Sequence, residues 1–377
     1  MVRCMTQSFH MLGKTIRVSF DESTASRILE RELGLYPSAT ASERPDFEIR
    51  HSAFETPNTG FVNPATHHDL TDGFSARFGP TTVRWVLEEG ALRRIDFHLH
   101  PAAATGVRRR IQRMRSNQFT LPDEAIGQIF HELVLIPSVY FDPQQFLLHA
   151  SGLQAPDGTV TLIGGTGGVG KTSLGLELSR HHGFRFVTDD IAVVDRAGHV
   201  WPNLAFPKIY GYNVDGDAEL RRLLLRGGGW EDRLNWKLHR RRGADRVRRR
   251  VSPADLYSAY SPAGGKLARY FFIARELRDD VVVERSSSTL LAPLSTAIMD
   301  AEYHAFHNHL AWHGMNRLLR GVLPVLTRNA VLERWCELAS DTLASVDCLV
   351  VRVPRTMNHV QFKAAMVELI TASGTLV

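Results

Sequence analysis

The chain has 377 residues, of which 44% are hydrophobic and 23% charged, and its formal net charge is +5 at pH 7. This length allows two domains with separate cores, and the composition is that of a soluble globular protein rather than a disordered or fibrous one. Three scattered cysteines give no disulfide framework and favour a reducing compartment. Because we find neither a signal-peptide pattern nor an apolar run of membrane-spanning length, we expect a cytoplasmic protein.

Residues 1–120 are predicted to form a small N-terminal α+β domain. Residues 15–20 and 46–50 alternate apolar and polar side chains, as half-buried strands do. A helical spacing of apolar residues follows Asp21, and strand patterns on both sides of residues 88–90 (Glu-Glu-Gly) predict a β-hairpin. Nothing in this region has the spacing of a catalytic motif, so we assign no site to it.

A second domain is predicted for residues 121–377, beginning with a helix and a strand. The strand pattern covers residues 146–150 and includes His149. A single histidine in an apolar strand usually has a structural role, so its local sequence leaves the function of His149 open. A second short apolar and β-branched run, residues 159–163, predicts a buried strand.

A glycine-rich motif follows this buried strand. It reads Gly165-Thr166-Gly167-Gly168-Val169-Gly170-Lys171-Thr172 and matches the phosphate-loop pattern G-x-x-x-x-G-K-[ST] at every fixed position. Leu174 and Leu178 then have helical spacing, which places the motif between a strand and a helix. Glycines let backbone N–H groups turn onto an anion, and a helix N-terminus adds positive charge. The alternative is a glycine-rich turn without a ligand.

The motif predicts a nucleotide site that holds ATP. Lys171 would reach the β- and γ-phosphates, and Thr172 would ligate Mg²⁺. The residues expected to bind the nucleotide are Gly165, Thr166, Gly167, Gly168, Val169, Gly170, Lys171, Thr172 and Ser173.

Two adjacent aspartates follow the next predicted strand. Residues 184–188 are mostly apolar and lead directly into Asp189 and Asp190. A carboxylate at the carboxyl end of a strand can hold Mg²⁺ or its waters, so one aspartate could serve the metal and the other the acceptor hydroxyl. The alternative is a polar turn into the strand predicted at residues 191–194.

His149, the glycine loop and the aspartate pair together resemble the HPr serine kinase/phosphorylase superfamily, which is related in structure to the ATP-dependent phosphoenolpyruvate carboxykinases. The resemblance implies an α/β P-loop fold of that type in residues 121–377, with ATP and Mg²⁺ as cofactors. It implies catalytic roles for Asp189, His149 and Lys171, with Asp189 accepting the hydroxyl proton. It also implies that Thr172 and Asp190 hold Mg²⁺.

The chain departs from true HPr kinases in one respect. The glycine- and arginine-rich signature that serves their reverse phosphorolysis is not visible. The chain is more similar to HPr-kinase-like proteins of biosynthetic gene clusters, some of which phosphorylate a serine of a precursor peptide. We therefore expect transfer of the γ-phosphoryl group of ATP to a hydroxyl of a peptide, a protein or a small molecule, with a serine as the preferred acceptor.

An arginine-rich insertion is predicted near residues 221–250, which contain twelve Lys or Arg and three acidic residues. Its densest clusters are Arg240, Arg241, Arg242, Arg248, Arg249 and Arg250. One interpretation is a solvated insertion, because so many like charges repel one another. The other is a binding surface for phosphates or an acidic acceptor. Nucleic acid is disfavoured as a partner because only Trp230 and Trp236 supply aromatic rings.

The remaining pattern completes an α/β domain. Residues 267–274, 281–284 and 347–353 predict strands, and residues 293–343 and 359–371 predict helices. Histidines in the longer helical region, including His309 and His313 at i and i+4, are expected to form a structural helix face, because the glutamate of a zinc-protease motif is missing between them.

Three function classes remain open at this stage. The favoured one is an ATP- and Mg²⁺-dependent peptide or protein kinase. The alternatives are a kinase for a sugar or metabolite and a regulatory ATPase without a phosphoacceptor. The sequence leaves the oligomeric state open, with a homo-oligomer among the alternatives.

Overall fold

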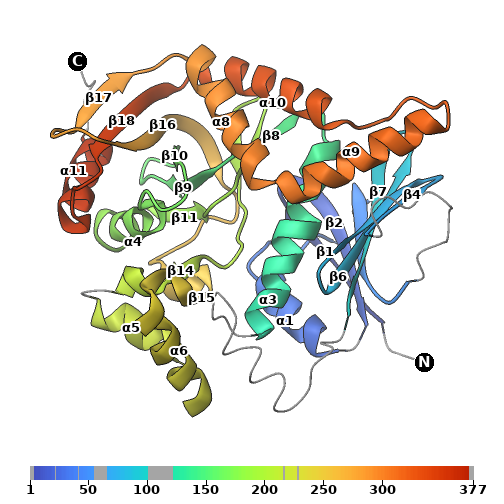
Figure 1. Cartoon of the computed structure of the whole chain (residues 1–377), viewed down its shortest axis with the longest axis horizontal. Helices are drawn as coiled ribbons and strands as arrows, with labels where there is room; N and C mark the ends of the chain where they lie inside the picture. Colours follow the sequence, from blue (N-terminus) through green and yellow to red (C-terminus); the bar gives the residue numbers. More distant parts are fainter. Residues whose placement is uncertain are drawn as a thin grey trace.

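The computed structural model describes residues 4–21, 23–40, 42–54, 66–100, 122–214, 217–226 and 229–372. It is a mixed α/β structure in which two large sheets lie side by side (Figure 1). The predicted division into two domains near residue 120 stays a prediction, because residues 101–121 lie outside the described part of the chain. In that described part, no helix is both long enough and apolar enough to cross a lipid bilayer.

The first sheet has seven strands in the order β1-β2-β3-β7-β6-β5-β4. They are β1 (Cys4–Met11), β2 (Lys14–Asp21), β3 (Phe47–His51), β4 (His67–Leu70), β5 (Gly73–Phe78), β6 (Thr81–Glu88) and β7 (Ala91–Leu99). The predicted hairpin joins β6 to β7 through Glu89 and Gly90, whose φ angles of 52° and 83° suit a tight turn of this hand. The alternating pattern of β2 buries Ile16, Val18 and Phe20.

Two helices, α1 and α3, contact each other beside this sheet (Figure 1). Helix α1 (Thr24–Leu33) begins where the Ser23 side chain accepts a hydrogen bond from the Ser26 amide. Helix α3 (Pro122–Ile129) continues into a π-helical turn (Phe130–Leu135) and a 3₁₀ segment (Ile136–Phe141). These two helices carry acidic residues that contact the arginine-rich segment described below.

The second sheet has nine strands, most of which follow the order β11-β9-β10-β16-β13-β12-β8, and β18 pairs with both β16 and β17. They are β8 (Gln145–Leu148), β9 (Ala150–Gln154), β10 (Val160–Gly165), β11 (Arg185–Thr188), β12 (Ala192–Asp195), β13 (His199–Trp201), β16 (Gly265–Glu276), β17 (Val282–Arg285) and β18 (Asp347–Pro354). Strands β10, β16 and β18 run parallel, so their carboxyl ends share one edge of the sheet. Ligands of open α/β sheets bind outside such an edge.

Helices cover the second sheet from both sides (Figure 1). Helices α4 (Lys171–His182) and α11 (His359–Thr371) contact each other, as do α8 (Ser288–Glu302) and α10 (Arg328–Leu343). Between α8 and α10 the chain forms α9 (His304–Leu319), which reaches across to the first sheet and contacts β4. The strands and helices predicted for residues 267–371 are confirmed, with the helical region divided into three.

The arginine-rich segment is folded where the structure describes it. It contains α5 (Ala218–Leu224), α6 (Trp230–Arg242) and β15 (Arg248–Arg250), which pairs with β14 (Lys208–Tyr210); a short helix α7 (Pro253–Leu256) follows. Arg250 donates two hydrogen bonds to the carboxylate of Glu32, of 2.6 and 2.9 Å, and both side chains are almost fully buried. Arg249 donates one of 2.5 Å to Glu124.

These ion pairs correct the prediction for Arg248, Arg249 and Arg250. Arg249 and Arg250 are buried, and Arg248 donates to the Gln128 side chain, so this cluster joins the segment to α1 and α3 instead of meeting an external anion. Burial acts to raise the pKa of Glu32, but His131 and Arg250 outweigh it and hold the pKa below its ordinary value. The other cluster, residues 240–242, lies in the last turn of α6, where cations are favourable.

We expect Arg250→Leu to destabilise the protein by about 3–5 kcal/mol, because it leaves the Glu32 carboxylate buried without its partner. The double variant Glu32→Leu/Arg250→Leu should lose less, since no charge is then left unpaired. Urea denaturation measures both. The exposed Arg241→Gln is the control and should change stability by less than about 0.5 kcal/mol. A single variant as stable as this control would show that the pair contributes nothing.

Helix α9 contacts the first sheet through buried histidines, as predicted for a structural helix face. His309 stacks on His67 of β4 with ring centroids 5.5 Å apart, and His313 Nδ1 lies 2.7 Å from an Asp69 carboxylate oxygen. Arg320 also contacts Asp69, at 3.1 Å. Burial, together with neighbouring histidines, lowers the pKa of His67 to about 3, and burial lowers that of His309 to about 4.

These pKa values predict a loss of stability in acid. Below about pH 6.5, the ordinary histidine value, the unfolded chain binds protons that the native His309 does not bind, so stability falls as the pH decreases towards 4. His309→Gln removes this group and should flatten the dependence by at least about 1.4 kcal/mol, the equivalent of one pKa unit. Urea midpoints between pH 7.5 and 4.5 measure the slope. Exposed His304→Gln on the same helix is the control, and equal slopes in both variants would contradict the prediction.

Candidate functional site

The glycine loop lies at the carboxyl edge of the second sheet. Strand β10 ends at Gly165 and helix α4 begins at Lys171, so the strand and the helix predicted around the loop are both present. Gly165, Gly168 and Gly170 have φ angles of 133°, 78° and 109°, which side chains rarely adopt. A Cβ atom at Gly170 would come within 2.6 Å of the Phe362 ring on α11, whereas nothing lies within 4 Å of one at Gly167. The loop is therefore in contact with α11 at Gly170 and open at Gly167.

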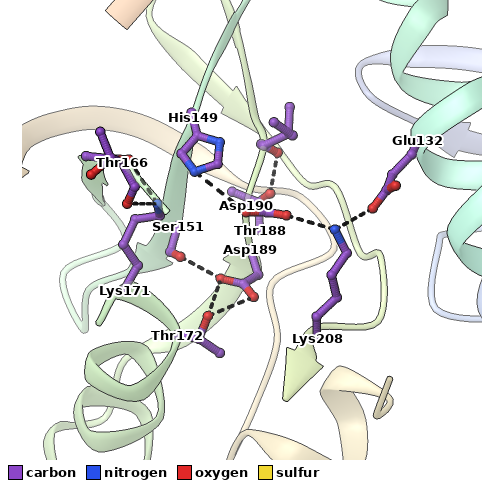
Figure 2. Close-up of polar contacts among 12 residues, drawn as sticks. Glu132, His149, Ser151, Thr166, Lys171, Thr172, Thr188, Asp189, Asp190 and Lys208 are labelled. Carbon is purple, nitrogen blue, oxygen red and sulfur yellow. Dashed lines mark hydrogen bonds and ion pairs between the residues drawn. The ribbon is translucent and has the colours of Figure 1, made fainter. Parts of the chain in front are cut away.

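Lys171 curls back over this loop (Figure 2). Its ammonium donates to the carbonyl oxygens of Gly165 and Thr166, at 3.0 and 3.3 Å, and the residue is only 7% exposed. Burial lowers the pKa of Lys171, while Asp190 and Asp189 act in the opposite direction. Among the described residues, no carboxylate lies close enough to form an ion pair with it. The lysine is thus a buried cation with only neutral hydrogen-bond partners.

Asp189 faces the glycine loop. Thr172 Oγ1 lies 3.2 and 3.1 Å from the two carboxylate oxygens of Asp189, and Ser151 donates a hydrogen bond of 2.6 Å to one of them (Figure 2). Burial and the neighbouring charge of Asp190 raise the pKa of Asp189, and the bond from Ser151 opposes this shift. Within the described structure, no Lys, Arg or His forms an ion pair with Asp189. Its described side-chain partners are therefore two hydroxyl groups.

Asp190 faces the opposite way and has a cationic partner. Its φ angle of 72° is left-handed, which is unusual for a residue other than glycine and is often found at functional sites. Its side chain is 47% exposed, with Oδ2 3.1 Å from Lys208 Nζ and Oδ1 3.7 Å from His149 Nε2. Partial desolvation acts to raise the pKa of Asp190, but Lys208, His149 and Lys171 hold it well below its ordinary range. Lys208 is itself fixed by Glu132, at 2.5 Å.

His149 lies at the break between two strands. The prediction of one strand through residues 146–150 is wrong at this point, because β8 ends at Leu148 and β9 begins at Ala150. Burial, with smaller effects of the Lys171 and Lys208 charges, lowers the pKa of His149 to about 4, while Asp190 acts in the opposite direction. Its imidazole is therefore neutral near pH 7, and neither ring nitrogen has a hydrogen-bond partner in the described structure.

The structure brings together five of the predicted site residues: His149, Lys171, Thr172, Asp189 and Asp190. One pairing differs from the expectation, because Thr172 contacts Asp189 rather than Asp190. The six arginines of the predicted acceptor site make none of these contacts. Of these six, Arg250 lines a cavity of about 40 Å³ together with the aspartate pair, but Glu32 holds its guanidinium.

Three side chains of the site were missed. Ser151, Lys208 and Glu132 come from β9, β14 and the π-helical turn, and none belongs to a sequence motif. Only the position of Ser151 two residues after His149 offered a signal. Among the described residues, no group of three or more His, Cys, Asp or Glu side chains is arranged to hold a metal ion without other ligands.

Comparisons with known proteins give similarity to solved structures only. No protein-family model matches the chain, and no curated protein sequence matches it. Among solved structures, the chain is similar to the HPr(Ser) kinase/phosphatase from Coxiella burnetii, with 19% identity and a TM-score of 0.19. The match covers 37% of this chain and 77% of that one. A similarity at this level carries no argument about the site, whose chemistry follows from its own contacts.

Proposed function

We propose that the protein is an ATP- and Mg²⁺-dependent kinase that transfers the γ-phosphoryl group to a hydroxyl, with a serine of a peptide or protein as the preferred acceptor. One observation carries this proposal. A buried lysine whose hydrogen-bond partners are all neutral lies near two adjacent carboxylates in different environments, at the edge of the sheet where ligands of α/β folds bind.

The loop fits a polyphosphate. Lys171 is a cation without an ion-pair partner among the described residues, and the space in front of Gly167 and Gly168 is open. The first turn of α4 adds backbone N–H groups and the positive end of a helix dipole. These features are suited to bind and orient the β- and γ-phosphates of ATP, which would compensate the charge of Lys171.

Thr172 and Asp189 fit Mg²⁺. Both supply oxygen ligands, which Mg²⁺ prefers, and Asp189 is a buried carboxylate that lacks a cationic partner in the described structure. We therefore assign Mg²⁺ to Thr172 and Asp189, which reverses the roles that the family resemblance implied for the aspartates. When bound, Mg²⁺ would neutralise charge on the phosphate oxygens.

Asp190 fits the acceptor side. It is half exposed, and Lys208 occupies Oδ2, which leaves Oδ1 to receive the proton of the acceptor hydroxyl. The neutral, unpartnered ring of His149 lies beside Oδ1 and is suited to a hydrogen bond with the acceptor. The acceptor oxygen then bonds to phosphorus as the bond to ADP breaks. A low pKa makes Asp190 a weak base, which suffices where the transition state is loose and positioning dominates.

Mg·ATP should stabilise the wild type by about 2.7 kcal/mol at roughly one hundred times its Kd, because it binds only the native state. Lys171→Ala should lose most of this stabilisation, since it removes the cation nearest the loop. Thermal melts with and without Mg·ATP measure the effect. Exposed Lys237→Ala is the matched control and should respond like the wild type. Equal shifts in all three proteins would remove Lys171 from the nucleotide site.

The two aspartates should respond differently to the loss of one charge. Asp189→Asn should weaken the Mg²⁺-dependent part of ATP binding, because a metal ligand acts in the ground state. Asp190→Asn should retain Mg·ATP binding and slow phosphoryl transfer by about 10²–10⁴-fold, the usual contribution of a general base. Calorimetry with and without Mg²⁺ measures binding. Mass spectrometry for a gain of one phosphate on candidate acceptors encoded beside the gene measures transfer.

Two results would change this assignment. If Asp190→Asn bound Mg·ATP poorly while Asp189→Asn bound it well, the order of roles implied by the resemblance would be restored. If ADP release in the wild type were independent of every acceptor tested, a regulatory ATPase would replace the kinase. Phosphate gain on sugars or metabolites instead of peptides would favour a small-molecule kinase.

A further inference from the structure

Three adjoining hollows lead away from the aspartate pair. The innermost, of about 40 Å³, is lined by Asp189, Asp190 and Lys208. It shares Phe206 and Arg250 with a second hollow of about 490 Å³, which lies between α1, α3 and the arginine-rich segment. The second shares Arg226 with a third hollow, of about 800 Å³, along α5 and the start of α6. The shared residues make the three hollows neighbours, from the proposed acceptor side of the site to the outside of the segment.

Positive charge lines the outer part of this surface, which we name the basic groove. It is defined by Arg31, Arg221, Arg222, Arg226 and Arg233, which line the second and third hollows and are all exposed. For the described residues, the structure shows no carboxylate partner of Arg31, Arg226 or Arg233. These side chains therefore keep their full charge towards solvent.

The acidic residues of the same hollows are mostly neutralised. Glu32 and Glu124 are held by Arg250 and Arg249 in the second hollow, and Asp217 of the third is held by Arg180 at 2.8 Å. Only Asp255 remains exposed without a described ion pair. Internal ion pairs thus neutralise most of the acidic residues in these hollows, and the groove as a whole presents an excess of positive charge.

This arrangement selects an anionic polypeptide. Guanidinium groups bind carboxylates in a forked geometry, and several exposed like charges gain most from a ligand that carries several negative charges. Single-stranded nucleic acid would use aromatic rings for base stacking. Phe206 is the one aromatic residue described in the second and third hollows, and Arg250 already lies 5.6 Å from its ring centroid.

We propose that the phosphoacceptor carries an acidic polypeptide segment, which binds along the basic groove while the acceptor hydroxyl lies at Asp190. The proposal rests on the kinase function proposed above and names the substrate class of that site. It assigns the affinity for the acceptor to arginines that touch neither the nucleotide loop nor the aspartates. The arginines predicted from the sequence as acceptor ligands are thus replaced by a different set from α1, α5 and α6.

The test compares two triple variants. The groove variant is Arg31→Gln/Arg226→Gln/Arg233→Gln, with at least one residue in each outer hollow. The matched control is Arg44→Gln/Arg77→Gln/Arg93→Gln, which removes the same charge from exposed positions that line none of the three hollows. The probe is a fluorescein-labelled peptide of alternating Glu and Ser. Fluorescence anisotropy measures its binding, and mass spectrometry measures its phosphate gain with Mg·ATP.

The groove variant should bind the peptide roughly 10-fold or more weakly at low salt, as expected for three screened surface charges. Its binding should also depend less on salt, because the interaction of exposed charges is screened within about 10 Å at 0.1 M ionic strength. The control should bind within about twofold of the wild type, since surface charges distant from the ligand contribute little. Stabilisation by Mg·ATP should be unchanged in both variants, which also confirms that they are folded.

Each contrary result has a separate meaning. Equal binding of the peptide by the wild type and the groove variant overturns the groove. Tighter binding of labelled single-stranded RNA than of the peptide, lost in the groove variant, assigns the surface to nucleic acid and also overturns it. Equal phosphate gain in all three proteins supports the proposed kinase function and contradicts a role of the basic groove in acceptor binding. If the peptide binds through the basic groove but the protein does not bind Mg·ATP, the groove proposal is supported and the proposed kinase function is overturned.

Discussion

Two carboxylates that follow each other in the chain cannot share one environment without repelling each other, and the site is organised around their separation. The left-handed backbone of Asp190 accompanies this separation, with Asp189 against the hydroxyl groups of Thr172 and Ser151 and Asp190 against Lys208. Their pKa values consequently shift in opposite directions. Pairs of acids with such divergent environments commonly divide the chemistry of a site between them. In the proposed function, the division follows from the cationic partner that Asp190 has and Asp189 lacks.

The arginine-rich segment shows how one run of charge can have two uses. Its buried members, Arg249 and Arg250, connect β15 to the helices beside the first sheet. Such a buried pair is weak evidence for high stability, because desolvating both charges costs nearly as much as their attraction returns, but it does fix the relative position of the elements that carry it. The exposed arginines of the segment lie on a surface whose position these buried ion pairs fix. The arginines of this segment look alike in sequence, but burial divides them into a buried group that connects elements and an exposed group.

The sequence predicted local features well and distant partners poorly, for a physical reason. A strand, a glycine loop and a helix leave their signals in consecutive residues, and the helix predicted at residues 359–371 is α11. Periodicity carries no information about residues far away in the chain. Glu32 and Glu124 precede Arg250 and Arg249 by more than a hundred residues, so a buried pair was indistinguishable from a solvated run. Lys208 was also missed, because the local pattern around it gives no sign of its contact with Asp190, 18 residues earlier in the chain.

The support of the glycine loop by Phe362 has a consequence for the folding of the loop. The motif itself is local, but Gly165 lies against Ile273 of β16 and Gly170 against Phe362 of α11, and both partners are distant in the chain. Contacts of long sequence separation form slowly, because the entropy of closing the intervening chain must be overcome first. The conformation of the loop therefore depends on β16 and α11 being in place, so the strand and the helix of the motif alone would lack the rigid backbone that presents their amide groups.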